Sequence, residues 1–311
     1  MSPKIIYLDQ NIWIYLARAY YGINKDVKIK RICEKVIKTS ESNSSIFPLS
    51  INHLFESHHK LDLGKRDKLI DFMSKVSKGY TIPTFTSVIE TEIKNATLKK
   101  LGYRTINKRD FEIKGGFSNM FGATGTIQGN IPEDLKNLMI EWINSPEAFT
   151  LLAKSHKIFD KDDSFIEAIE RIEKERSTYT RIKDPKIRDK VILAENIKAI
   201  LYPTIIKICY ELGIYNFFKG WNEKELMDFI KEIPTFYVLF NLSYQNEKNY
   251  NRPIKRNDIY DISSLSIAIP YCDIVVTEKH FASITKSVKL DKIYNTIILC
   301  WSSIDELEKH L

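Results

Sequence analysis

The amino-acid sequence predicts an α/β fold with a parallel β-sheet core and a large α-helical insertion. Short apolar runs alternate with segments of helical spacing at the start of the chain and again near its end. Consecutive parallel strands need crossover helices, so this alternation predicts parallel pairing. The middle of the chain has helical periods and a charged surface pattern throughout. We therefore expect an α/β core from residues 1–85 and 252–311, and an insertion from residues 86–251.

Two strand–helix units open the chain. Ile5–Leu8 is a continuous apolar run, as expected of a strand buried on both faces, and helical spacing starts at Asn11. A second apolar run covers 46–49, and Ser50 is a suitable N-cap for the helix after it. Residues 78–85 are a third strand candidate, although Pro83 in this run limits its pairing.

In the insertion, helical periods cover 165–172, 190–200 and 224–233. Residues 114–130 contain five of the eleven glycines, and we expect a mobile loop there. Near the end of the chain the alternation returns, with strands expected at 273–277 and 296–300 and helices before, between and after them.

Composition and charge narrow the class of protein. The 47 Lys and Arg residues exceed the 40 Asp and Glu residues, and the formal charge of +7 favours an anionic partner. The four cysteines form no Cys-x-x-Cys pair, which argues against a zinc knuckle and a disulfide framework. No apolar run approaches the roughly 20 residues that span a bilayer. We expect a cytoplasmic protein with no membrane partner.

Acidic side chains follow the predicted strands and lie near the starts of predicted helices. Asp9 and Glu278 each come directly after a strand, and the carboxyl ends of parallel strands are where functional groups collect. Glu56 lies in the helix after Ser50, and Asp258 and Asp261 share one helix face. Capping of a helix is an equally simple role for Asp9 and for Asp258.

Converging carboxylates repel one another, and a divalent cation normally neutralises them. Oxygen ligands without His or Cys favour Mg²⁺ or Mn²⁺ over zinc, and such an ion suits phosphodiester chemistry. His53, His58 and His59 are expected at the surface or in a supporting position, since neighbouring histidines on a helix point to different faces.

Basic and aromatic residues alternate just before Asp258, a mixture that suits single-stranded nucleic acid. Arg252, Lys255 and Arg256 are therefore the expected substrate contacts, with a solvated basic loop as the alternative.

The stretches "YLDQNIWIYLA" and "DISSLSIAIPYCDIVVTEKHF" resemble motifs of the PIN-domain nuclease superfamily. The resemblance implies a Rossmann-like three-layer core, and it makes Asp9, Glu56, Asp261 and Glu278 the metal-binding and catalytic acids. Asp258 matches a further acidic position, and Asn11 becomes a substrate contact. The family more usually has Asp or Asn at the position of Glu278, so the number of bound metal ions stays open.

PIN-like proteins are mostly endoribonucleases, many of them toxins or phage-defence effectors. The resemblance therefore implies an Mg²⁺- or Mn²⁺-dependent enzyme that cuts single-stranded or structured RNA. An inhibitory protein partner and a homodimer are compatible with it. Two alternatives stay open: a non-catalytic RNA- or protein-binding module on a degenerate PIN scaffold, and a DNA-directed nuclease.

Overall fold

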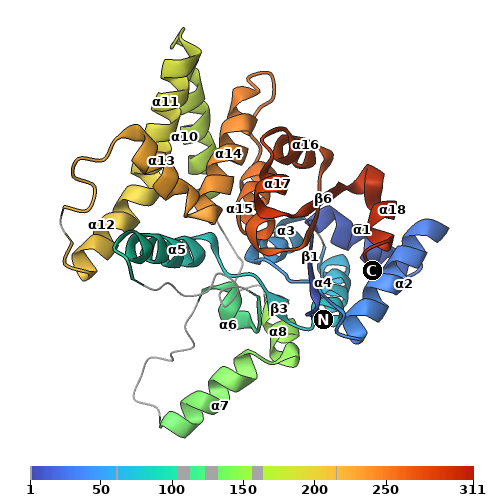
Figure 1. Ribbon diagram of the computed structural model, residues 1–311. Helices are drawn as coiled ribbons and strands as arrows, with labels where there is room; N and C mark the ends of the chain where they lie inside the picture. Colours follow the sequence, from blue (N-terminus) through green and yellow to red (C-terminus); the bar gives the residue numbers. More distant parts are fainter. Residues whose placement is uncertain (1, 61, 104–112, 123–131, 156–163, 215) are drawn as a thin grey trace. The chain divides into compact units, whose positions relative to one another are not determined.

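The computed structural model describes residues 2–60, 62–103, 113–122, 132–155, 164–214 and 216–311, with the labels shown in Figure 1. The contacts within the chain define two compact units. Unit 1 consists of residues 1–84, 112–161 and 271–311, and unit 2 consists of residues 85–111 and 162–270.

The four strands that form the sheet of unit 1 are all parallel, in the order β2-β1-β5-β6, which confirms the predicted α/β class with a parallel sheet. Strand β1 lies inside the sheet, where Ile6 pairs with Ile274 and Leu8 with Val276 of β5. The bounds are β1 (Lys4–Leu8), β2 (Ser45–Ile46), β5 (Ile274–Thr277) and β6 (Ile297–Cys300).

Helices pack on this sheet, and α1, α2 and α4 bury their apolar faces in one core. Trp13 of α1 is fully buried and meets Phe72 of α4 edge to face at 6.1 Å between ring centroids. Helices α1, α2 and α4 pack on one another (Figure 1). The helices are α1 (Gln10–Tyr20), α2 (Val27–Glu41), α3 (Ile51–Lys60), α4 (Leu63–Ser77), α6 (Phe117–Met120), α7 (Glu133–Ile143), α8 (Pro146–Ala153), α16 (Lys279–Ser287), α17 (Leu290–Tyr294) and α18 (Ile304–Glu308), with a 3₁₀ turn at Trp301–Ser303.

Part of the glycine-rich segment is regular structure, not the mobile loop expected from the sequence. Strand β4 (Lys114–Gly115) pairs antiparallel with β3 (Tyr80–Thr81), and α6 follows directly. Gly116 has a φ of 118°, and a Cβ there would overlap the side chain of Asn144, so the turn between β4 and α6 needs glycine. The rest of the predicted loop, 123–130, lies outside the described residues.

The two units divide the chain differently from the predicted boundaries. Phe117, Met120, Phe149 and Ala153 are buried in the core of unit 1, so residues 112–161 belong with the sheet. Residues 252–270, expected with the sheet, belong to the helical unit. Local periodicity identifies a helix, but it does not reveal which core the apolar face of that helix joins.

Unit 2 is helical, and its core joins α5, α12, α13 and α14. Glu92 of α5 is buried and accepts hydrogen bonds from the N–H and hydroxyl of Thr235, so it supplies the cap that the start of α14 lacks. The helices are α5 (Phe85–Lys100), α10 (Ser164–Tyr179), α11 (Pro185–Asn196), a π-helical turn (Ile197–Leu201), α12 (Tyr202–Glu211), α13 (Glu223–Lys231), α14 (Pro234–Lys248) and α15 (Arg256–Tyr271). Within the described ranges, no helix has both the length and the apolar composition needed to cross a bilayer.

Candidate functional site

Asp9 lies at the carboxyl end of the inner strand β1, where the chain turns directly into α1. Its backbone N–H still donates to the carbonyl of Val276 in β5, at 2.9 Å, which fixes its position at the sheet edge. Its Oδ1 accepts from the Gln10 N–H at 2.6 Å, and its extended backbone places it as the N-cap of α1. Asp9 therefore has the capping role, and its carboxyl group is buried.

Two further carboxylates of unit 1 act on Asp9. Glu56 is buried on α3, and Glu278 follows β5 directly as the exposed N-cap residue of α16. Burial first, then the charges of Glu56 and Glu278, raise the pKa of Asp9 to about 7, while N–H donors of Gln10 and Glu278 oppose that rise. Three acids from distant parts of the chain thus meet at one sheet edge.

Neighbouring polar side chains hold these acids in place. The amide Nδ2 of Asn11 donates to Oε1 of Glu278 at 2.6 Å, and the hydroxyl of Thr277 donates to Oδ2 of Asp9 at 3.4 Å. Asn11, expected to contact substrate, therefore positions a carboxylate in this structure. Sequence reasoning gave no role to Thr277, although it occupies the strand end next to Glu278.

A buried polar chain connects α1 to α3. The side-chain amide of Gln10 donates to the Ser57 hydroxyl at 2.8 Å, and that hydroxyl donates to the carbonyl of His53 at 2.7 Å. Gln10 and Ser57 are the chain neighbours of Asp9 and Glu56. The Gln10–Ser57 bond therefore ties the start of α1, next to Asp9, to the part of α3 that carries Glu56.

His53 is buried, which contradicts the surface alternative and leaves the supporting position as a prediction. Its ring stacks on Tyr7 at 5.2 Å, and its Nδ1 accepts from the Ser50 N–H at 3.0 Å. Burial lowers the pKa of His53 to about 3, so the imidazole is neutral at neutral pH. The sequence pattern did not show this, because the apolar partners of the ring come from β1 and α1.

The raised pKa of Asp9 predicts a specific pH dependence. The ordinary value is 3.8, so the native state binds the proton more tightly than the unfolded state, and the free energy of unfolding falls as pH rises from about 4 to about 7. The shift corresponds to about 4 kcal/mol. Urea denaturation in EDTA at pH 5 and pH 8 should show about 3 kcal/mol of this fall for the wild type, and a much smaller fall for Asp9→Asn. Equal falls in both proteins would contradict the assignment.

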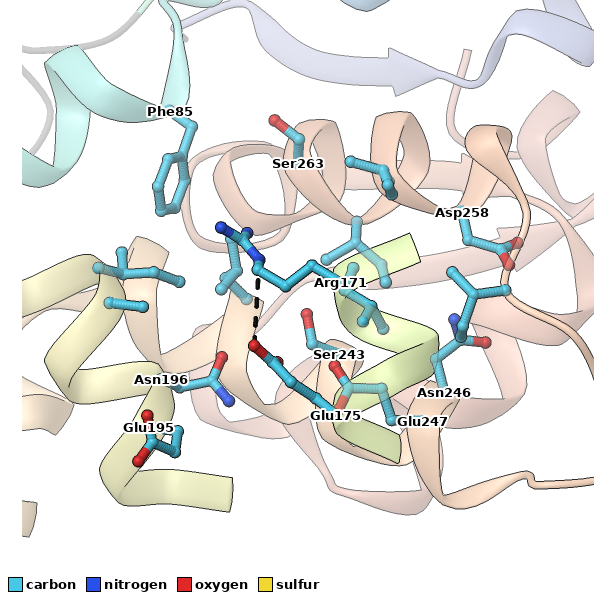
Figure 2. A pocket seen from close by; sticks show the side chains of 17 residues that line it. Phe85, Arg171, Glu175, Glu195, Asn196, Ser243, Asn246, Glu247, Asp258 and Ser263 are labelled. Carbon is cyan, nitrogen blue, oxygen red and sulfur yellow. Dashed lines mark ion pairs between the residues drawn. The ribbon is translucent and has the colours of Figure 1, made fainter. Parts of the chain in front are cut away.

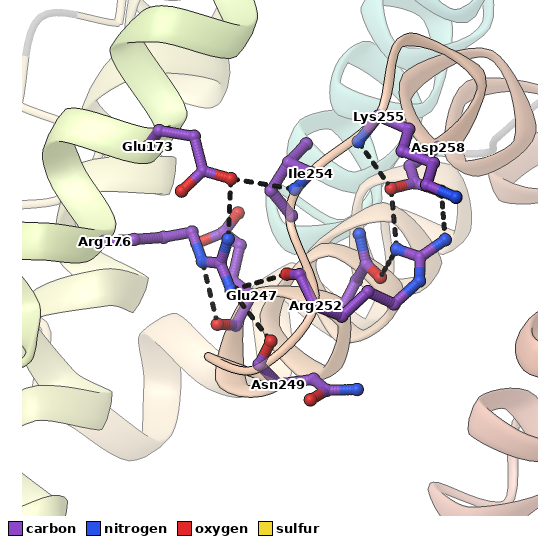
Figure 3. A network of polar contacts seen from close by, with 9 residues as sticks. Glu173, Arg176, Glu247, Asn249, Arg252, Ile254, Lys255 and Asp258 are labelled. Carbon is purple, nitrogen blue, oxygen red and sulfur yellow. Dashed lines mark hydrogen bonds and ion pairs between the residues drawn. The ribbon is translucent and has the colours of Figure 1, made fainter.

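Asp258 has a different environment in unit 2 (Figure 3). Arg252 donates to both of its oxygens, at 2.6 and 2.7 Å, and the Lys255 N–H donates at 2.8 Å. Burial acts to raise the pKa of Asp258, but the hydrogen bonds from Arg252 and Lys255 outweigh burial and lower it. The structure gives Asp258 the ion-paired capping role, and it leaves Arg252 engaged with protein groups instead of substrate.

Arg176 of α10 anchors the segment that precedes Asp258, a role that the sequence did not reveal (Figure 3). The buried guanidinium donates to the carbonyls of Glu247, Asn249 and Arg252 at 3.2, 2.8 and 3.1 Å. It also pairs with Glu173 at 2.7 Å, and Glu173 in turn accepts from the Ile254 N–H. One cation thus ties α10 to the connection between α14 and α15.

Asp258 also lines a cavity of about 410 Å³ within unit 2 (Figure 2). Apolar side chains form much of the wall, and Arg171 and Glu175, one turn apart on α10, form an ion pair of 4.0 Å in it. Burial, followed by the charge of Glu175, raises the pKa of Glu247 in this wall to about 7, although Arg176 opposes the rise. The cavity combines apolar surface with acidic groups.

The other predicted site residues of unit 2 lie at the start of α15. Asp261 is buried, one helical turn after Asp258, and its metal-binding role stays a prediction. Lys255 is exposed, and Arg256 is half-buried with its Nε donating to the Tyr260 hydroxyl at 3.1 Å.

The acids around Asp9 offer only oxygen donors, which fits Mg²⁺ or Mn²⁺ better than zinc. Across the residues that the structure describes, no group of three or more His, Cys, Asp or Glu side chains is arranged to hold a metal ion. Asp9, Glu56 and Glu278 are thus an acidic cluster with the right donor chemistry and without completed ligand geometry. Comparison with protein-family models, curated proteins and solved structures found no match to this chain.

Proposed function

We propose that this protein is a metal-dependent endoribonuclease whose active site is centred on Asp9. One observation carries the proposal: burial together with Glu56 and Glu278 raises the pKa of Asp9 to about 7 at the carboxyl end of the inner strand. A buried acid that is further perturbed by two like charges is the usual mark of a functional site and attracts a cation.

In this proposal the unit 1 acids Asp9, Glu56 and Glu278 would hold Mg²⁺ or Mn²⁺. The ion supplies activation of a water molecule and stabilisation of charge on the phosphate. Asn11 orients Glu278 through the 2.6 Å bond, and the Gln10–Ser57 bond ties the start of α1 to the part of α3 that carries Glu56. These positioning contacts matter because an active site must be held to within about 0.5 Å.

Lys255 and Arg256 are the proposed phosphate contacts. Lys255 is exposed and Arg256 is half-buried, and both side chains carry the positive charge that phosphate contact needs. Arg252 is removed from the proposed contacts because both ends of its guanidinium fork already bind Asp258.

The test compares substrates of one sequence: single-stranded RNA, a hairpin RNA and single-stranded DNA, each with Mg²⁺, Mn²⁺ or EDTA. We expect internal cuts in RNA with Mn²⁺ or Mg²⁺ and no cleavage with EDTA. Preferential cutting of DNA would replace the proposal by a DNA-directed nuclease. RNA binding without cleavage in either metal would replace it by a non-catalytic binding module.

A further inference from the structure

A second surface of unit 1 lies between α1 and α4 and has a cavity of about 540 Å³, which we call the α1–α4 groove. One face of α1 contributes residues spaced at i, i+3, i+4 and i+7, and one face of α4 contributes residues spaced at i, i+3 and i+4. The groove is thus a furrow between two helical faces. Its main lining residues are Ile14, Ala17, Arg18 and Tyr21 from the first face, and Lys65, Lys68 and Leu69 from the second.

The floor of the groove is apolar and partly open to solvent. Ala17 and Leu69 are buried at its base, and Ile14 packs against the core. At its edge Tyr21 is 37% exposed and Ile23 is 58% exposed. A cavity of this size with exposed apolar edges is large enough for several apolar side chains of a ligand.

Positively charged side chains lie on both sides of the groove. Lys65 pairs with Asp62 at 2.7 Å, and the nearby acids Asp67 and Asp71 pair with Arg66 and Lys154, so within the described part of the chain neither Arg18 nor Lys68 forms an ion pair. Lys68 lies 5.8 Å from the centre of the Tyr21 ring, so its charge remains at the groove. Arg18 belongs to α1 and Lys68 to α4, which leaves one uncompensated positive charge on each side of an apolar floor.

We propose that the α1–α4 groove binds an acidic amphipathic helix of a partner protein. The apolar stripe of such a helix would fill the floor, and carboxylates on both sides of the stripe would meet Arg18 and Lys68. A fatty acid carries a single carboxylate and could pair with only one of the two cations. The inference does not depend on the nuclease proposal, because no lining residue belongs to the acidic cluster around Asp9.

Gly64 provides a way to close the groove without straining the fold. It lines the groove near the start of α4, and a Cβ added there meets only the Asp62 carboxylate, at an ordinary 3.7 Å. The backbone therefore accepts a Cβ here, and we expect the ring of a phenylalanine at this position to occupy ligand space. Gly64→Phe tests the apolar floor. Charge reversal at Arg18 and Lys68 tests the charges and leaves that floor unchanged.

The experiment measures fluorescence anisotropy of a labelled helical peptide of about 18 residues, long enough for five turns, with a leucine stripe flanked on both sides by glutamate. We expect the full chain to bind this probe and not the same peptide with lysines in place of glutamates. The double variant Arg18→Glu/Lys68→Glu should weaken binding at least about tenfold, and Gly64→Phe should also weaken it. Lys286→Glu, a matched reversal of an exposed lysine on α16, should change the affinity less than about twofold.

Circular dichroism verifies the fold of each variant. If Arg18→Glu/Lys68→Glu does not fold, the affinity of Gly64→Phe for the peptide decides the test. Absence of binding by the acidic peptide, or equal binding by wild type and Gly64→Phe, overturns the proposal. Binding of dodecanoate without binding of the peptide also overturns it, in favour of a small-amphiphile site. Self-association of the chain that Gly64→Phe abolishes would identify a second copy as the occupant, which equally contradicts a partner helix.

Discussion

Replacing Asp9 by Asn should reduce metal-dependent RNA cleavage by about 10³-fold or more, because the change removes the central carboxylate of the proposed site. Asparagine has nearly the same shape and is itself a good N-cap, so α1 keeps its cap. Stability above pH 7 should be equal to or higher than that of the wild type, since Asn removes a buried charge that Glu56 and Glu278 repel. Single-turnover cleavage with Mn²⁺ and a denaturant titration together measure both effects.

Asp26 offers the matched control. It is also an N-cap aspartate, accepting from the N–H groups of Lys28 and Ile29 at the start of α2, but it is exposed and lies outside the acidic cluster around Asp9. Asp26→Asn should therefore leave cleavage within about twofold of the wild type. The proposed function is contradicted if Asp9→Asn retains wild-type cleavage, or if both variants lose activity to the same extent.

Replacing Arg176 by Met should lower the free energy of unfolding of unit 2 by about 3–5 kcal/mol. The change leaves the carbonyls of Glu247, Asn249 and Arg252 without their donor and leaves Glu173 without its cation. We expect amide hydrogen exchange to accelerate over residues 249–255, whose path the guanidinium holds. Urea denaturation followed by circular dichroism measures the loss of stability.

Arg171 on the same helix provides the control for this result. Its side chain is 69% exposed, and its ion pair with Glu175 spans 4.0 Å, so Arg171→Met should cost less than about 0.5 kcal/mol. Arg176→Lys should lie between the two, because an ammonium group cannot reach three carbonyls and a carboxylate as the guanidinium fork does. Equal denaturation midpoints for Arg176→Met and Arg171→Met would show that the network is not a stabilising anchor.

The sheet was predictable because each of its main strands has a strong local signal. Strands β1, β5 and β6 each contain at least three successive apolar residues and lie next to helical periods, which is the pattern of parallel strands covered by helices. The positions of Asp9 and Glu278 at strand ends follow from the same pattern. The position of Glu56 depended in addition on predicting the helix that begins after Ser50.

Contacts between distant segments could not be predicted in this way. Arg176 lies more than seventy residues from the carbonyls that it binds, and nothing in its local sequence distinguishes it from Arg171. Arg252 was expected to contact substrate because it belongs to a basic run. In the structure it forms an ion pair with Asp258, six residues later. In each case the deciding partner is a tertiary neighbour, which neither composition nor period reveals.

The pairing of β1 with β5 has a consequence for the time course of synthesis. Ile6 pairs with Ile274, which is synthesised 268 residues later. The inner strand β1 therefore lacks its neighbour β5 until that part of the chain has been made. At translation rates of about 5–20 residues per second, this delay exceeds about ten seconds. Glu278 emerges in the same late stretch, so a nascent chain displays Asp9 long before the third acid of its cluster exists. A ribosome-bound chain therefore cannot carry out a reaction that needs all three acids until residues 274–278 have emerged.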